Sequence, residues 1–133
     1  MNDVVIDSNI VIWYFGELSQ LSNHAETKVD AAVDRGTVLV PSIVIVELVY
    51  LIERNRVPSE VLDKLREALD QDPTVFRLVQ LTRQIADELA NVDRSIVADM
   101  PDRIVAATAL HLDLPLVTSD GNLRRLSNVE TIW

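Results

Sequence analysis

Four carboxylates stand where a solvated acid is not expected, each beside an apolar run or inside one: Asp7, Glu47, Asp102 and Asp120. Most of the 21 acidic residues of the chain lie on the polar sides of amphipathic segments, where water solvates them. Glu47, in contrast, is the only charge between residues 43 and 52. Burial of an unpaired carboxylate is costly, so Glu47 needs either a nearby cation or a proton.

Each of these acids also has an ordinary structural explanation. Asp7 and Asp120 follow apolar runs and can close the turns or cap the helices that come next. Asp102 can interact with the dipole at the start of a helix. Glu47 can pair with an arginine that faces the core. Taken one at a time, the four acids therefore leave both explanations open.

Taken together, the four acids favour a metal site. Asp7 and Asp120 end predicted buried strands, and the carboxyl ends of parallel strands meet at one edge of a sheet. Carboxylates gathered there repel one another, so Asp7→Asn is expected to stabilise the metal-free protein. Hard oxygen ligands select Mg²⁺ or Mn²⁺ over zinc, and such an ion activates water and polarises a phosphodiester. The predicted chemistry is phosphoryl cleavage.

Short apolar strands that alternate with amphipathic helices must position these acids. The predicted strands are 4–6, 38–40, 75–79, 116–118 and 129–132, and the predicted helices are 22–35, 43–52, 58–69, 82–96 and 101–112. The segment 43–52 has the β-branched content of a strand, but its length after Pro41 and Ser42 favours a buried helix. This alternation predicts an α/β fold in which helices cover both faces of a parallel sheet. A length of 133 residues suits a single domain, 1–133.

Composition narrows the classes of function. The net charge of −9 argues against a simple nucleic-acid-binding module, which carries a basic face, and suits a basic protein partner. Phosphates of an RNA substrate would need cations or local arginines, and three lie beside the proposed site: Arg103, Arg124 and Arg125. These arginines can equally balance the carboxylates.

Other features of the sequence bear on the cellular location of the protein. The chain has no cysteine, and its first residues lack the basic region of a secretory signal, so we expect a cytoplasmic protein. The longest apolar stretch, 39–52, is interrupted and is shorter than the roughly 20 residues that span a membrane. We therefore expect no membrane association.

The order and context of these residues resemble the PIN-domain family, and in particular the VapC-like toxins of type II toxin–antitoxin pairs. The resemblance covers essentially the whole chain. It rests on Asp7-Ser8-Asn9, on Glu47 in a hydrophobic helix after Pro41-Ser42, on Asp102-Arg103-Ile104-Val105-Ala106-Ala107-Thr108-Ala109, and on Thr118-Ser119-Asp120. The resemblance implies a three-layer α/β/α domain with a central parallel sheet that cleaves RNA endonucleolytically with Mg²⁺ or Mn²⁺.

The resemblance also implies roles for individual residues. It implies that the metal ligands and catalytic acids are Asp7, Glu47, Asp102 and Asp120, with Asp99 as a fifth ligand. Asn9 and Ser119 are implied to orient these ligands or the attacking water. A cognate antitoxin protein that covers the site and a toxin homodimer are the implied partners, beside the RNA substrate. Asn122 stands where relatives often carry another acid, so it is left out of the metal site.

Two other functions remain possible. A phosphatase of the haloacid-dehalogenase type also begins with a strand that ends in Asp, but it needs a second Asp where this chain has Asn9. It also needs a lysine late in the chain, and the only lysines are Lys28 and Lys64. The second alternative is a non-catalytic PIN-like module that binds a protein partner, because acids can hold an ion without turnover. RNA cleavage with Mg²⁺, lost in Asp7→Asn, separates an enzyme from such a module.

Overall fold

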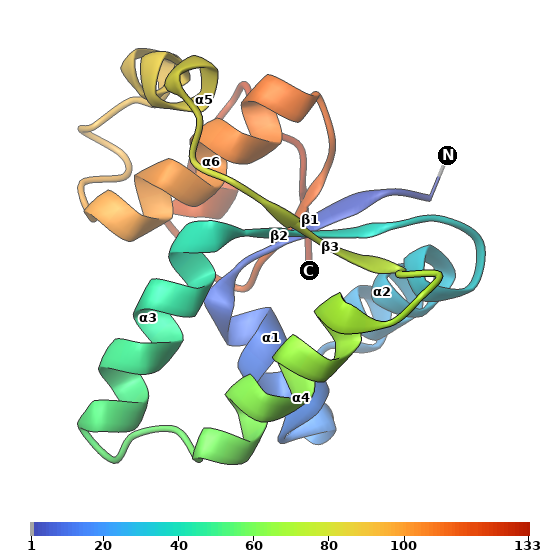
Figure 1. Cartoon of the computed structure of the whole chain (residues 1–133). Helices are drawn as coiled ribbons and strands as arrows, with labels where there is room; N and C mark the ends of the chain where they lie inside the picture. The colour runs from blue at the N-terminus through green and yellow to red at the C-terminus, as the bar shows by residue number, and fades with distance from the viewer. Residues whose placement is uncertain (1) are drawn as a thin grey trace.

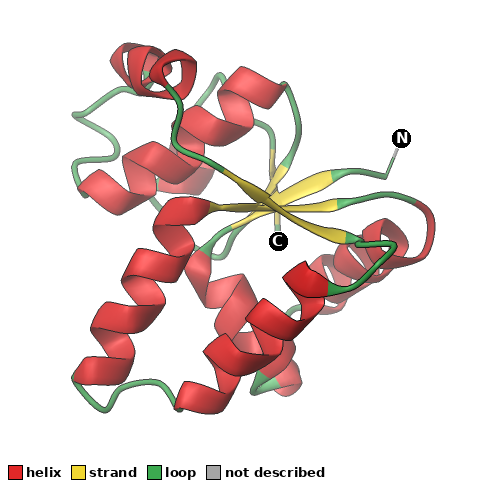
Figure 2. Cartoon of the chain, viewed as in Figure 1, coloured by secondary structure: helices red, strands yellow, loops and turns green. Residues whose placement is uncertain are grey.

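A five-stranded parallel sheet lies between two layers of helices in the computed structural model, which describes residues 2–133 (Figure 1, Figure 2). The strands are β1 (Val4–Ile6), β2 (Val38–Pro41), β3 (Phe76–Val79), β4 (Leu116–Val117) and β5 (Thr131–Ile132). Their order across the sheet is β3-β2-β1-β4-β5, and every neighbouring pair is parallel. The predicted α/β class and central parallel sheet are confirmed.

Six helices cover the sheet: α1 (Ser8–Phe15), α2 (Asn23–Arg35), α3 (Ser42–Glu53), α4 (Ser59–Asp70), α5 (Arg83–Glu88) and α6 (Met100–Leu112). Three short 3-10 turns accompany them: η1 (Leu18–Gln20), η2 (Leu89–Asn91) and η3 (Leu123–Arg125). In Figure 1, α1 to α4 lie on one side of the sheet, and α5 and α6 lie on the other. None of the helices in the described range has the length and apolar character to cross a membrane.

Burial from both sides explains the continuous apolar runs of the central strands. Every residue of β1 is buried, and so is every residue of β4. A strand covered on only one face would instead alternate apolar and polar residues. The central strands are therefore held rigidly, and the residues that directly follow them inherit well-defined positions.

The segment 43–52 is helical, as predicted. Helix α3 begins at Ser42, directly after β2, and buries Val44 and Leu48 on one face. Spacing of four residues places these two side chains on the same side of the helix, against the core. The carboxylate of Glu47 thus lies beside the row of buried side chains that Val44 and Leu48 form, and not within it.

The predicted helices differ from the observed ones in two places. The helix predicted over 82–96 ends at Glu88, because η2 follows and Asp93 then accepts hydrogen bonds from the backbone and hydroxyl of Ser95. Such local side-chain bonds compete with helix formation. Helix α1 was not predicted at all, although Asp7 caps it by accepting a hydrogen bond from the amide of Ile10.

Candidate active site

The candidate site lies at the edge of the sheet where β1 and β4 end. These strands are neighbours, with Ile6 opposite Val117, and Asp7 continues the pairing by donating its amide to the carbonyl of Val117. Helices α3 and α6 pack against each other beside this edge. The site can therefore draw residues from two strand ends, from the middle of α3 and from the start of α6.

A first group of acids comes from the two helices. Carboxylate oxygens of Glu47, Asp99 and Asp102 lie within 4.8 Å of one another. Glu47 and Asp102 are half-buried, whereas Asp99 is exposed. Asp99 also caps α6 by accepting a hydrogen bond of 3.3 Å from the amide of Asp102. The helix cap and the acidic group thus use the same residue.

A second group comes from the strand ends. Asp7 is 4% exposed, and its Oδ2 accepts a hydrogen bond from the hydroxyl of Thr118. The oxygen of the same hydroxyl accepts the amide of Asp120 at 3.0 Å. Asp120 in turn closes the following turn, because its Oδ1 accepts the amides of Asn122 and Leu123. Thr118 therefore connects the two acids that end β1 and β4.

Electrostatic coupling joins the two groups into one site. Burial raises the pKa of Asp102 to about 7, and the charges of Asp120, Asp99, Glu47 and Asp7 add to this rise. Burial likewise raises the pKa of Asp7 to about 6, against the opposing hydrogen bonds from Thr118 and Ile10. The pKa of Glu47 is also raised, first by burial and then by Asp99. Asp102 thus lies close enough to each of the other four predicted acids for their charges to affect it.

The donor set fits a hard divalent cation. No ion pair within residues 2–133 involves any of the five acids, so the arginine partner that could have explained Glu47 does not occur there. Crowded carboxylates without a counterion retain protons, whereas a bound Mg²⁺ or Mn²⁺ favours their ionised forms. Oxygen-only donors are the ligands that these ions prefer.

Two hydroxyl groups that the sequence analysis missed orient the acids. Ser8 Oγ donates to Glu47 Oε1 at 2.6 Å, and Thr118 holds Asp7 as described above. Asn9 is exposed and Ser119 is half-buried, and in the described part of the chain neither makes a side-chain hydrogen bond. Ser8 and Thr118 each directly precede a residue predicted to orient the carboxylates or the attacking water, and the roles of Asn9 and Ser119 stay predictions.

The three nearby arginines differ in their availability. Arg103 donates from Nη2 to the carbonyls of Leu89 and Val92, at 3.0 and 3.2 Å, and so fastens α6 to η2. One nitrogen of its guanidinium is therefore engaged in the fold, and contact of Arg103 with RNA phosphates stays a prediction. Arg124 and Arg125 are exposed in η3, directly after Asp120.

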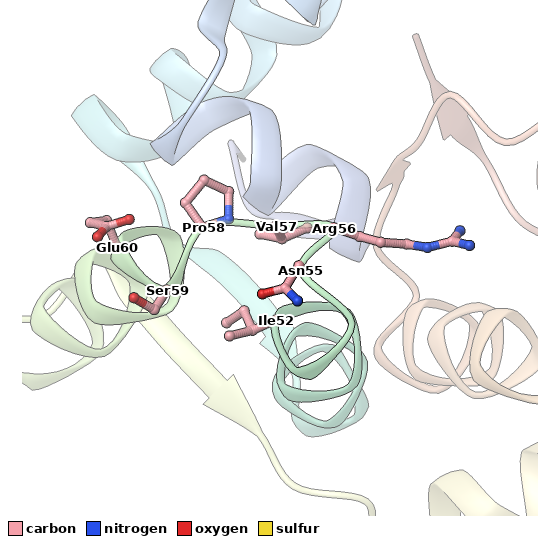
Figure 3. Close-up of a pocket in the computed structure, with 7 residues that line it drawn as sticks. All are labelled: Ile52, Asn55, Arg56, Val57, Pro58, Ser59 and Glu60. Carbon is pink, nitrogen blue, oxygen red and sulfur yellow. The ribbon is translucent and has the colours of Figure 1, made fainter.

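Two pockets contrast in their relation to the acids. A pocket of about 540 Å³ lies at the connection between α3 and α4, where Arg56 and Glu60 extend in opposite directions (Figure 3). None of the five acids lines it. A smaller pocket, of about 350 Å³, includes both Glu47 and Asp99 in its wall.

Comparison with known proteins finds relatives in both sequence and fold. The sequence is 29% identical over 135 residues to Ribonuclease VapC22 of Mycobacterium tuberculosis (strain ATCC 25618 / H37Rv), and the match covers all of both chains. Among solved structures, VapBC2 from Rickettsia felis bound to a DNA fragment from their promoter aligns with a TM-score of 0.73 and 15% identity, over 97% of this chain and 96% of the other. VapBC-5 from Mycobacterium tuberculosis aligns with a TM-score of 0.62 and 17% identity, over 98% of each chain.

At these identities the solved structures establish the fold alone. The sequence as a whole carries a stronger signal, because residues 4–129 match the PIN domain. That range contains all five acids, both orienting hydroxyls and every strand except β5. The chain belongs to the PIN-domain family.

Proposed function

We propose that this protein is a Mg²⁺- or Mn²⁺-dependent endoribonuclease and the toxin of a toxin–antitoxin pair. The observation that carries the proposal is the group of five acids, without a basic counterion, at the carboxyl edge of the sheet. Full-length similarity to a protein named as a VapC ribonuclease supports RNA as the substrate.

Each part of the site has a task in this proposal. Glu47, Asp99 and Asp102 together with Asp7 and Asp120 would hold the ion, which would acidify water and polarise the phosphodiester. Ser8 and Thr118 keep Glu47 and Asp7 in position through their hydroxyl groups. Arg124 and Arg125 offset the charge of the RNA backbone as it approaches an acidic protein. Asn9 and Ser119 remain candidates for contacts to the attacking water.

An acidic site on a protein of net charge −9 also suits a basic inhibitor. We propose a cognate antitoxin that inserts an arginine or lysine among the carboxylates in place of the metal, in the cytoplasm, where the toxin is present as a homodimer. Solved complexes named VapBC support a partner of this kind. The association of this protein with its antitoxin should weaken as the salt concentration rises, because salt screens the attraction between opposite charges.

Cleavage of purified RNA tests the enzymatic proposal. Wild-type protein should cut RNA with Mg²⁺ or Mn²⁺ and not with a chelator, and Asp102→Asn should lose at least about 10²-fold of the rate. Asp63→Asn, at an exposed position of α4, is the matched control and should cut normally. Metal binding without cleavage would support the non-catalytic module instead. Hydrolysis of a phosphate monoester without RNA cleavage would support the phosphatase.

A further inference from the structure

The smaller pocket shares a wall with the candidate active site. Its six lining residues are Val46, Glu47, Tyr50, Leu51, Asp99 and Pro101, and we call it the Tyr50 pocket. Two of the six are acids of the site, and the other four form a largely apolar wall. A volume of about 350 Å³ falls within the range of small-molecule sites, roughly 300–1,000 Å³. A group in this pocket would therefore lie directly beside a phosphate at the acids.

Exposed apolar side chains mark this wall. Val46 is 60% exposed and Tyr50 is 52% exposed, one turn apart on α3. The guanidinium carbon of Arg54 lies 3.6 Å from the centre of the Tyr50 ring, so a cation covers one face of this ring. Within residues 2–133, Arg54 takes part in no ion pair. The ring is thus held by the cation on one side while it lines the pocket.

The charge of the residues that line the Tyr50 pocket determines which kind of chemical group can bind there. A phosphate entering the pocket would face Glu47 and Asp99, which repel it, whereas a neutral planar group would meet Tyr50, Leu51 and Pro101. Unpaired RNA bases are planar and stack on aromatic side chains, and the next phosphate along the strand is anionic. Arg54, which lies on the ring of Tyr50 and has no ion-pair partner among the described residues, supplies the positive charge for that phosphate.

We infer that the Tyr50 pocket holds an unpaired nucleobase next to the scissile phosphate, and that Arg54 contacts the adjoining backbone phosphate. The inference rests on the proposed ribonuclease function and adds a positioning site to it. It also gives a physical reason for a single-stranded substrate, because a base in a helix is stacked and paired and cannot enter the pocket.

Three RNA substrates and a series of variants test this inference. The substrates are a short oligoribonucleotide with a mapped cleavage site and versions of it that are abasic on either side of that site. Tyr50→Ala should raise KM for the intact RNA about 10-fold, within the range of base–aromatic stacking, and Tyr50→Phe should behave as wild type. Leu18→Ala, at an exposed apolar position in η1 outside the pocket, is the control.

The abasic substrates provide the decisive comparison. Removal of the base on one of the two sides should raise the KM of the wild-type protein by a factor similar to that of Tyr50→Ala. The same removal should not raise the KM of Tyr50→Ala any further. Arg54→Ala should raise KM for intact and abasic RNA alike. Binding of both RNAs to the Asp102→Asn variant in Mn²⁺, measured by fluorescence anisotropy, should follow the same pattern without turnover.

Several results would overturn the inference. If wild type cuts intact and abasic RNA equally, or if Tyr50→Ala still distinguishes them, the pocket holds no base although the ribonuclease function stands. If Tyr50→Ala changes only the affinity for a protein partner, the pocket is a protein contact. If the wild-type protein neither binds nor cuts any RNA, the proposed function and the pocket fall together.

Discussion

Asp102 has no hydrogen-bond donor to its carboxylate among the contacts of residues 2–133, and burial raises its pKa, with four other acids adding to the rise. Asp7 differs, because its carboxylate accepts from both Ile10 and Thr118. The carboxylate of Asp7 is therefore partly a structural group, and that of Asp102 is not. The stabilisation first expected from Asp7→Asn is consequently expected from Asp102→Asn, since an asparagine at position 7 disturbs the bonds to Thr118.

This contrast gives a prediction for pH dependence without metal. The folded protein holds protons on Asp7 and Asp102, whose pKa values are about 6 and about 7, whereas the unfolded chain releases them near pH 4. The folded state therefore binds more protons between about pH 4 and pH 7, and its stability should fall as pH rises through this window. Melting temperatures in a chelator at pH 5 and pH 8 measure the fall.

Asp102→Asn should reduce that fall and should melt above wild type at pH 8, because it removes one repelling charge. Asp63→Asn serves again as the exposed control and should follow wild type. Identical melting curves for wild type and Asp102→Asn across the whole range would show that the carboxylates are not strained in the metal-free protein.

The hydroxyl of Thr118 is predicted to affect both the stability of the fold and the binding of metal. Thr118→Val keeps the shape but leaves Asp7 and the amide of Asp120 without this partner. We expect a loss of about 1–3 kcal/mol in the free energy of unfolding and a 10- to 100-fold weaker metal affinity. Thr118→Ser should retain most of the stability, measured by chemical denaturation, and most of the metal affinity, measured by Mn²⁺ titration. Normal metal binding in Thr118→Val would refute this role.

At the scale of the elements, periodicity predicted the strands and most helices correctly and failed between 89 and 96. Ile85 and Val92 are both buried, so the apolar spacing is real, but after Glu88 it reflects loop residues that contact the core. No range was predicted for helix α1, although Asp7 was expected to be able to cap a helix that follows it. Without α1, the sequence could not indicate that Ser8 faces inward to Glu47.

Distant acids were easier to predict than their hydroxyl partners. A charge inside an apolar run is conspicuous, as at Glu47, and parallel topology brings strand ends together. A threonine or serine is compatible with any environment, so Thr118 and Ser8 carry no such signal. The engagement of Arg103 with Leu89 and Val92 depended on where η2 lies, which the overlong helix prediction had concealed.

The fastening of α6 to η2 can be tested directly. Arg103→Met leaves two backbone carbonyls without their charged donor and should lower the free energy of unfolding by about 1–3 kcal/mol. Arg124→Met, at an exposed arginine, should change it by less than about 0.5 kcal/mol. Urea denaturation measures both. Equal stability of the two variants would mean that the Arg103 contacts contribute nothing.

For the molecule as a whole, the bound cation should be a large part of its stability. Binding to the folded state alone stabilises by RT ln(1 + [L]/Kd), about 2.7 kcal/mol when the free ion is at 100 times Kd. In a domain of 133 residues this corresponds to a rise of roughly 10 °C in Tm. The rise should saturate with Mn²⁺ and should be smaller in Asp102→Asn. A flat response of wild type to Mn²⁺ would contradict a metal site at the five acids.

The strand order has a consequence for the time at which the protein can become active in a cell. Strand β1 is made first but lies in the middle of the sheet, and its partner β4 comes from residues 116–117. A nascent chain that stops before Thr118 has Asp7 without its hydroxyl partner and also lacks Asp120, one side of the acidic site. The ribosome therefore releases no working nuclease domain until it has translated past this point. Translational arrest upstream of the Thr118 codon should leave inactive fragments, and a protein that cuts RNA would be harmless to the cell until this strand has been made.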